Sequence, residues 1–162
     1  MVILFVVSSF TVFAQKSQKV FNLDTTKDTL YLNKTGVVNH YTNCRSENDD
    51  STKYEEFKQE INSINRELAS FIGQKKFDFR TNEDAVALMH KFYVNPKGEI
   101  EYCSFIARSM LSKRTTRKYA KLLEEFIEER KVNYENETPF FICGQTVYRL
   151  RYGRLLGPGK KK

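Results

Sequence analysis

Three cysteines and two histidines are the residues with the greatest capacity for chemistry in this chain of 162 residues. A cysteine thiolate beside a histidine base is the nucleophile of several hydrolase classes. Here that chemistry requires one of the cysteines at positions 44, 103 and 143 to lie beside one of the histidines. His90 instead falls in phase with apolar neighbours in a predicted strand, which favours a packed core histidine.

The spacing of these residues argues against the common metal and redox sites. The cysteines are odd in number and form no Cys-x-x-Cys pair, so neither a thioredoxin-like site nor a zinc knuckle is expected. His40 and Cys44 are four residues apart, but no third or fourth ligand accompanies them, so we expect no metal. Cys103 and Cys143 lie in predicted strands, where a single cysteine is commonly a small buried side chain. The alternative, in an oxidising compartment, is a Cys103–Cys143 disulfide.

Other sequence patterns of enzymes are missing as well. The chain has no Gly-x-Ser-x-Gly nucleophile motif and no Gly-rich phosphate loop. The glutamates between positions 124 and 129 fall on the polar face of a predicted helix, which indicates a solvated surface and not an acid–base pair. We therefore expect a non-enzymatic protein that needs no cofactor.

The N-terminal sequence is typical of an export signal. Residues 2–12 are apolar apart from two serines and a threonine, no charge precedes Lys16, and Val12-Phe13-Ala14 offers small or medium residues for cleavage. The apolar run is too short for a membrane-spanning helix, which needs about 20 residues. We expect residues 1–14 to be removed, which leaves a periplasmic or secreted protein without a transmembrane span.

The composition is that of one folded domain, with 40% hydrophobic and 14% aromatic residues. The formal net charge of +7 can favour nucleic acid, anionic lipid or acidic glycan. The lysines and arginines are nevertheless spread along the chain, which favours a simple role in solubility. We expect no nucleic-acid partner, because an exported protein meets little of it.

The clearest predicted element is a β-hairpin over residues 85–107. Its first strand places alternate residues on a core face: Val86, Leu88, His90, Phe92 and Val94. The sequence Asn95-Pro96-Lys97-Gly98 then has the chemistry of a type I turn. The return strand runs over 99–106, and its core-facing residues are expected to be Ile100, Tyr102 and Ile106.

Two amphipathic helices are expected to pack on one face of an antiparallel sheet, in an α+β fold. The first spans 52–72, begins with a capping box of Thr52 and Glu55, and ends at Gly73 in a left-handed conformation. Its apolar stripe is Tyr54, Phe57, Ile61, Ile64, Leu68 and Phe71. The second follows the basic stretch 112–118, with Thr115 or Thr116 as N-cap. Its buried face is Tyr119, Leu122, Leu123, Phe126 and Ile127.

The remaining segments complete the division of the chain. Residues 15–50 are expected to hold a short hairpin over 19–33 and a polar connection. The α+β domain then occupies 51–153 and ends in two strands, 139–143 and 146–152, separated by a break at Gly144-Gln145. Residues 154–162 are expected to form a disordered basic tail.

The order hairpin, helix, strand from Ala85 to Tyr152 resembles the C-terminal domain of TonB-type periplasmic proteins. The matching positions are Phe92, Val94, Asn95, Gly98 and Ile100 in the hairpin, and Pro139, Gly144, Val147 and Tyr152 in the last strand. The chain departs from the family at residues 115–118, where the family has a Leu-Asp pair, and we find no membrane anchor or Pro-rich spacer of an energy transducer. The resemblance implies a stand-alone domain of this type in a Gram-negative envelope.

Two functional interpretations follow. A right-handed crossover places the last strand beside the first strand of the hairpin, at the sheet edge. There an extended segment of an envelope protein, such as an outer-membrane receptor or transport component, could add as a further strand. The residues of that site would be Val147, Tyr148, Arg149, Arg151 and Tyr152. The arginines could equally be charges that prevent edge pairing.

The alternative is a basic surface that binds anionic glycan or lipid headgroups. Its residues would be Lys113, Arg114, Arg117 and Lys118. A charge-driven contact of this kind weakens steeply with salt, whereas strand addition does not.

Overall fold

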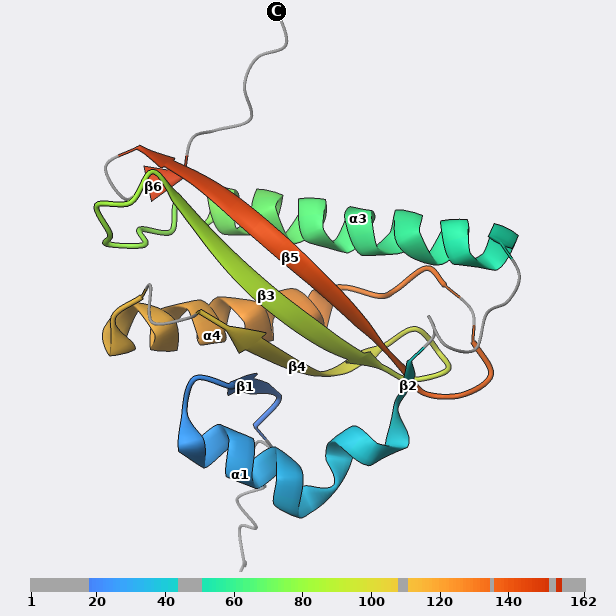
Figure 1. Ribbon diagram of the computed structural model, residues 1–162. Helices are drawn as coiled ribbons and strands as arrows, with labels where there is room; N and C mark the ends of the chain where they lie inside the picture. Colours follow the sequence, from blue (N-terminus) through green and yellow to red (C-terminus); the bar gives the residue numbers. More distant parts are fainter. Residues whose placement is uncertain (1–17, 44–50, 108–110, 135, 152–153, 156–162) are drawn as a thin grey trace, which may run out of the picture.

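The computed structural model describes residues 18–43, 51–107, 111–134, 136–151 and 154–155, and this part of the chain has an α+β fold (Figure 1). The strands are β1 (Val20–Asn22), β2 (Thr42–Asn43), β3 (Ala85–Val94), β4 (Ile100–Ile106), β5 (Phe140–Arg151) and β6 (Arg154–Leu155). The helices are α1 (Thr26–Thr35), α3 (Ser51–Gln74) and α4 (Lys113–Glu129), with a 3-10 turn η1 (Val37–His40). The predicted signal sequence lies outside the described residues.

The sheet is mixed and mostly antiparallel, with the strand order β1–β4–β3–β5–β2. Strand β1 runs parallel to β4 and β2 runs parallel to β5, whereas β3 is antiparallel to both of its neighbours. Strand β6 turns back antiparallel on the end of β5. Strand β5 therefore lies beside β3, as predicted. The further prediction that β5 is the edge strand of the sheet is wrong, because β2 and β6 pair with the two ends of its other side.

The predicted hairpin is confirmed as β3 and β4. The Gly98 N–H donates to the Asn95 carbonyl at 2.9 Å, and the Asn95 side chain accepts from the Lys97 and Glu99 N–H groups. Gly98 has φ +77°, and a Cβ there would collide with the Val132 carbonyl oxygen. Glycine is needed at this position for both reasons.

The expected phase of β4 is wrong after its first residue. Val94 pairs with Ile100 but Tyr93 pairs with Tyr102, so one extra residue forms a β-bulge in β4. Because the bulge shifts the alternation by one residue, Cys103 and Phe105 enter the core in place of Tyr102 and Ile106, which are half-buried on the other face.

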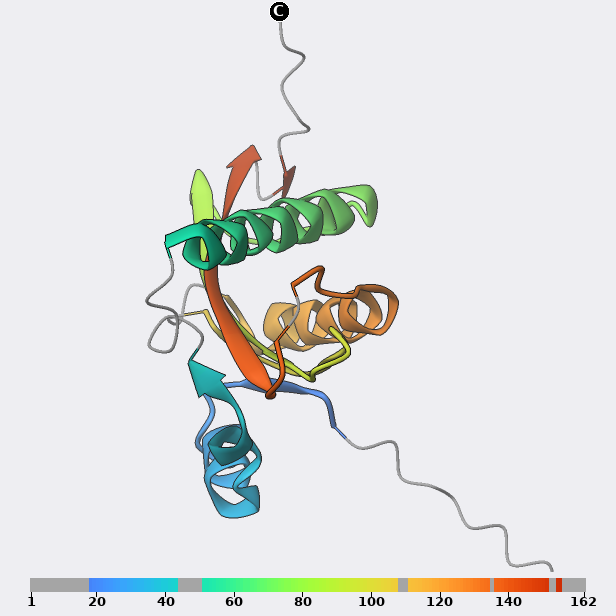
Figure 2. The same cartoon turned by 90° about the vertical axis from the view of Figure 1, so that its right-hand side faces the viewer.

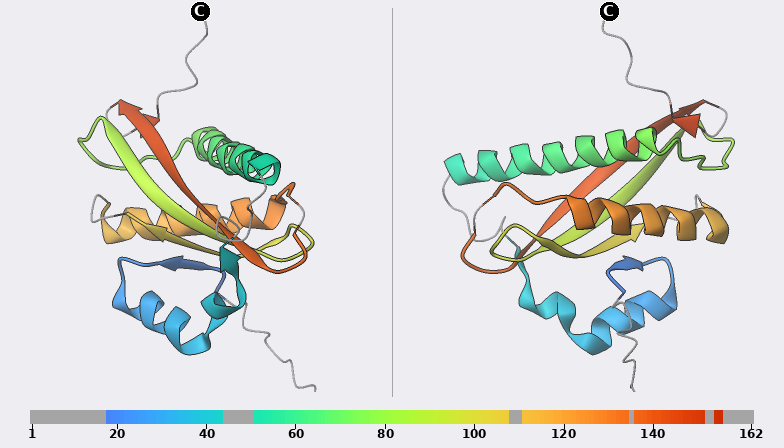
Figure 3. Two further views of the ribbon diagram at one scale, coloured as in Figure 1. Left: turned by 45° about the vertical axis from the view of Figure 1, so that its right-hand side comes forward. Right: turned by 180° about the vertical axis from the view of Figure 1, so that it is seen from behind.

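Helices α3 and α4 pack on the same face of the sheet, as predicted (Figures 2 and 3). Between them and the sheet lies one core, to which β3 contributes the predicted face from Val86 to Val94. The core residues of the two helices are Phe57, Ile64, Leu68 and Ile72 from α3, and Tyr119, Leu123, Phe126 and Ile127 from α4. Leu122 and Phe71, also expected there, are half-buried at its margin.

Both helices extend beyond their predicted ends. Helix α3 continues past Gly73 to Gln74, and the left-handed residue that follows it is Lys76, with φ +50°. Helix α4 begins before the predicted caps, because the Ser112 hydroxyl accepts from the Thr115 N–H at 3.2 Å. Thr115 and Thr116 are buried in its first turn. The basic stretch 112–118 is therefore part of a helix and not a turn.

The predicted hairpin over 19–33 is wrong, because its second strand is helix α1. The Thr25 hydroxyl accepts from the Asp28 N–H at 3.3 Å at the start of this helix, and Gly36 ends it with φ +63°. Helix α1 and η1 cover part of the other sheet face. There Phe21 stacks on Tyr31, with 5.5 Å between ring centroids.

The last strand also differs from its prediction. Gly144-Gln145 does not interrupt it, since β5 is continuous from Phe140 to Arg151. Arg154 and Leu155, assigned to the tail, form β6. Within the described ranges, none of the helices combines the length and apolar content needed to cross a membrane.

Candidate functional site

The candidate site is the outer edge of β5, and its backbone orientation follows from the pairing with β3. Leu150 donates its N–H to the Asp84 carbonyl at 2.7 Å, which marks a hydrogen-bonded pair. In an antiparallel ladder such pairs recur at every second residue. The even-numbered residues of β5 therefore direct their N–H and C=O groups toward β3, and the odd-numbered residues direct theirs outward.

Both ends of this outer edge already hold a strand of the same chain. At one end the Thr42 N–H of β2 donates to the Pro139 carbonyl at 3.0 Å, and β2 pairs with Phe140 and Phe141. At the other end β6 pairs with Leu150 and Arg151. Along residues 142–149, which span roughly 26 Å, no strand of the described chain pairs with this edge. The outward groups of this interval belong to Cys143, Gln145, Val147 and Arg149.

The opposite edge of the sheet, at β1, is closed by side chains. Asp28 accepts the Asn22 N–H at 2.8 Å, and the Gln18 amide donates to the Val20 carbonyl at 2.9 Å. The Asn22 carbonyl accepts from both the backbone and the hydroxyl of Thr25. Side-chain capping of this kind prevents a further strand from pairing, so the two sheet edges are not equivalent.

Helix α3 lies alongside the β5 edge and crosses in front of β5 in the view of Figure 2. The Thr146 hydroxyl donates to the Asn65 amide oxygen at 3.0 Å, and a Cβ at Gly144 would collide with the same amide. Glu60 lies on the opposite flank of α3, next to α4, and forms an ion pair with Arg130 at the end of α4. The α3 flank that carries Asn65 therefore lies on the side of the open edge.

The side chains of β5 divide cleanly between the two sheet faces. Val147 is 55% exposed, and Arg149 and Arg151 are also exposed, on the face away from α3 and α4. Tyr148 was predicted to contact a partner, but it is fully buried and bonds Tyr119. Because its side chain points into the core, it cannot reach a partner. Tyr152 lies outside the described residues.

Sequence reasoning missed two residues of this edge, Cys143 and Gln145, and one neighbouring residue of α3, Asn65. Cys143 was expected to end a strand and Gln145 to lie in a break, although the alternation of residues 140–151 is unbroken when read as one segment. No local signal identifies Asn65, because its role depends on where α3 crosses β5.

A buried polar chain links His90, Tyr119 and Tyr148. His90 Nε2 lies 2.8 Å from the Tyr119 hydroxyl, which lies 2.7 Å from the Tyr148 hydroxyl. Burial lowers the pKa of His90 to about 3, and burial also raises the pKa of both tyrosines. His90 is 2% exposed, so the prediction of a packed core histidine is confirmed. A substrate has no access to these three hydrogen-bonded side chains, which come from β3, α4 and β5.

The alternative prediction of a Cys103–Cys143 disulfide is wrong. Cys103 pairs with Phe92 and Cys143 pairs with Lys91, and successive residues of β3 point to opposite faces of the sheet. Cys103 is buried in the core and Cys143 is exposed on the far side, and both are free thiols. Burial raises the pKa of Cys103, which keeps it protonated and unreactive.

The remaining predicted residues lie apart from this edge. His40 is exposed in η1, and its predicted neighbour Cys44 lies outside the described residues. The basic candidates Lys113, Arg114, Arg117 and Lys118 are exposed on the first turns of α4. No grouping of three or more metal-ligating side chains occurs within the described ranges.

The chain was compared with protein-family models, with curated proteins and with solved structures, and it matches none of them.

Proposed function

We propose that this chain is an exported, non-enzymatic binding protein that captures an extended segment of a partner protein as an added strand on β5. The observation that carries the proposal is the difference between the sheet edges. Side chains close the edge of β1, whereas Cys143, Gln145, Val147 and Arg149 present outward N–H and C=O groups on β5. Such groups bind an extended peptide by completing the ladder.

Two further features support this mode of binding. Strands β2 and β6 already add to the same edge, one parallel and one antiparallel, so its geometry accepts a strand in either direction. An incoming strand between them would lay alternate side chains on the α3 flank and on the exposed face beside Val147. Affinity would come from the backbone groups, and specificity from these two surfaces.

The order β3, β4, α4, β5, with β5 beside β3, also supports the proposed likeness to the C-terminal domain of TonB-type proteins. Together with the apolar N-terminal sequence, it favours a location in a Gram-negative envelope. The partner would then be an envelope protein, such as an outer-membrane receptor or a transport component.

Val147→Pro tests the proposal, because it removes an outward N–H and leaves the bonds to β3 in place. We expect it to abolish capture of the partner from an envelope extract while circular dichroism stays unchanged. Val147→Ala is the matched control: it removes the side chain, retains the N–H, and should still capture the partner.

The location of the contact is tested with a photo-crosslinking amino acid at position 145 or, as a control, at position 30 on α1. Crosslinks to the captured protein from position 145 alone are expected. Unchanged capture by Val147→Pro would refute docking at this edge. Loss of folding would show that the Val147 N–H bonds β3, which would refute the orientation of the strand.

A further inference from the structure

Helix α4 carries its charges in two blocks. The first block is cationic and occupies its N-terminal half: Lys113, Arg114, Arg117, Lys118 and Lys121. The second block is acidic and occupies its C-terminal half: Glu124, Glu125, Glu128 and Glu129. The first turn contains no acidic residue, and the last turn contains no basic residue.

This order is opposite to the one that stabilises a helix. The helix dipole favours acidic side chains near the N-terminus and basic side chains near the C-terminus. In addition, Lys113 and Arg117 are four residues apart, as are Arg117 and Lys121, and like charges at this spacing repel each other. The stability of α4 therefore gives no reason for the cationic block.

The cations of this block form no ion pairs within the described residues, whereas the acidic block is matched by Lys75, 2.7 Å from Glu125, and by Lys19, 3.9 Å from Glu128. Asp24 and Asp28 line a neighbouring hollow that also includes Lys113, Arg117 and Lys121, but neither forms an ion pair with them, and each accepts a backbone N–H, from Ala107 and Asn22 respectively. The five positive charges face solvent together.

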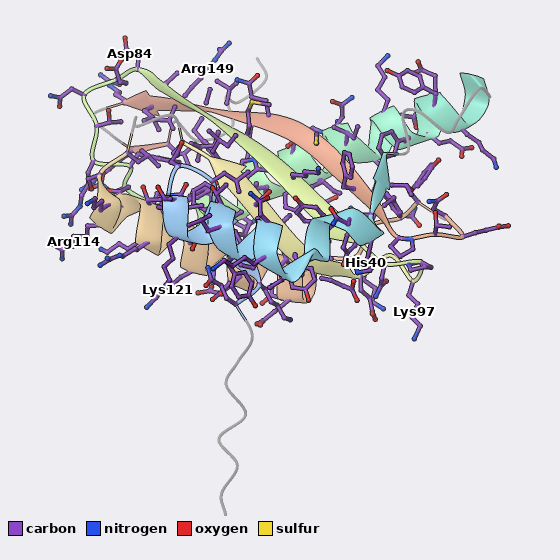
Figure 4. All side chains as sticks on the ribbon, turned by 60° about the horizontal axis from the view of Figure 1, so that its bottom comes forward. His40, Asp84, Lys97, Arg114, Lys121 and Arg149 are labelled. Atoms are coloured by element: carbon purple, nitrogen blue, oxygen red, sulfur yellow. The ribbon has the colours of Figure 1, made fainter. Side chains whose placement is uncertain are left out.

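The same five residues line a surface hollow of about 430 Å³. Arg114 and Lys121 point outward from α4 at the margin of the molecule in Figure 4. Lys113, Arg117 and Lys121 follow one another at intervals of about 6 Å along the helix. The hollow is thus an elongated cationic site about 12 Å long.

From this arrangement we infer that the cationic hollow of α4 binds a linear anionic glycan, with sulfate, phosphate or carboxylate groups spaced along a saccharide chain. A linear glycan can lie in the hollow and contact successive cations, whereas the surface of a bilayer is flat and cannot enter it. The large apolar side chains exposed in the described chain, such as Val147 and Met89, do not lie on α4, so the helix has no group to insert into lipid. Binding here is independent of strand addition at β5.

The test uses dextran sulfate oligosaccharides as the probe, neutral dextran as a control, and vesicles of phosphatidylcholine and phosphatidylglycerol as the membrane alternative. The full chain is compared with the variant Lys113→Gln, Arg117→Gln, Lys121→Gln. A matched control is Lys34→Gln, Lys53→Gln, Lys97→Gln, since these three lysines are exposed on other elements. Each triple variant lowers the formal net charge from +7 to +4.

We expect the α4 variant to bind the sulfated probe about tenfold or more weakly at low salt, and the control to bind as the original chain does. The slope of log affinity against log salt should fall in magnitude by about two for the α4 variant, at roughly 0.7 per cation for a flexible polyanion. Its midpoint of thermal unfolding should stay equal or rise, because repulsion is removed.

Equal loss of affinity in the control would overturn the site in favour of diffuse charge. Failure of the original chain to bind the probe, or binding to vesicles without binding to the probe, would overturn the choice of ligand. Unfolding of the α4 variant would show that these cations are held in contacts within the protein.

Discussion

Acidification from pH 7 to pH 5 should destabilise this protein chiefly through one residue, His90. Its side chain is 2% exposed, and Nε2 lies 2.8 Å from the Tyr119 hydroxyl in the core. Burial lowers the pKa of His90 from its ordinary value of 6.5 to about 3. The folded protein therefore keeps this imidazole neutral over a pH range in which the unfolded chain protonates it.

The sign of the effect follows from proton linkage. Because the folded pKa is the lower one, the contribution of His90 to stability is complete above pH 6.5 and is lost as pH falls toward 3. Integrating the difference in bound protons from pH 7 to pH 5 gives a loss of about 2 kcal/mol in the free energy of unfolding. The ordinary pKa values of aspartate and glutamate side chains, about 3.9 and 4.3, lie below this window.

The measurement is urea unfolding at pH 7, 6 and 5, with the free energy obtained by linear extrapolation. His90→Gln should remove most of the decrease, whatever its stability at pH 7. His40→Gln is the matched control, because His40 is the other histidine of the chain and is exposed in η1. A decrease that persists in His90→Gln, or that disappears in His40→Gln, would refute a neutral buried His90.

Two further predictions concern packing, and both are measured by urea unfolding at pH 7. Phe126→Ala and Phe57→Ala should each cost about 3–5 kcal/mol, because both rings are at most 5% exposed between the helices and the sheet. Leu30→Ala, at a side chain that is 51% exposed, should stay within about 0.5 kcal/mol; losses that small at both phenylalanines would contradict the packing. Gly144→Ala should cost about 1–3 kcal/mol, because the added Cβ collides with Asn65. Asn65→Ala should relieve part of that cost, and strict additivity of the two changes would argue against the contact.

Much of the local structure was predictable from short segments. The alternation from Val86 to Val94 and the turn at Asn95–Gly98 were enough for the hairpin, and the three-and-four spacing of apolar residues was enough for α3 and α4. These signals depend on residues within one or two turns of each other, so they can be read without knowledge of the fold. The four residues 29–32 did not suffice to predict α1, because so short a pattern of apolar residues fits either a strand or a helix. The hydrogen bond from the Asp28 N–H to the Thr25 hydroxyl caps the helix at this position.

The candidate site was predictable only in part. The alternation of the last strand predicted that Val147, Arg149 and Arg151 share its exposed face, and all three are exposed. Tyr148 was also predicted as a binding residue, but its side chain is buried in the core. The proposed Cys103–Cys143 bond failed because a single-residue bulge in β4 and the register of β5 place the two thiols on opposite faces.

By itself, the sequence determined the central hairpin, the two amphipathic helices and the alternation of the last strand, because periodicity and turn chemistry are local properties. Only the tertiary structure decided which backbone groups of β5 remain open, since that depends on where β2, β6 and α3 meet the strand. The closure of the β1 edge by Asp28 was likewise decided there. The cations of residues 113–121 line one hollow because the stretch is helical, and helical spacing brings residues four apart onto one face.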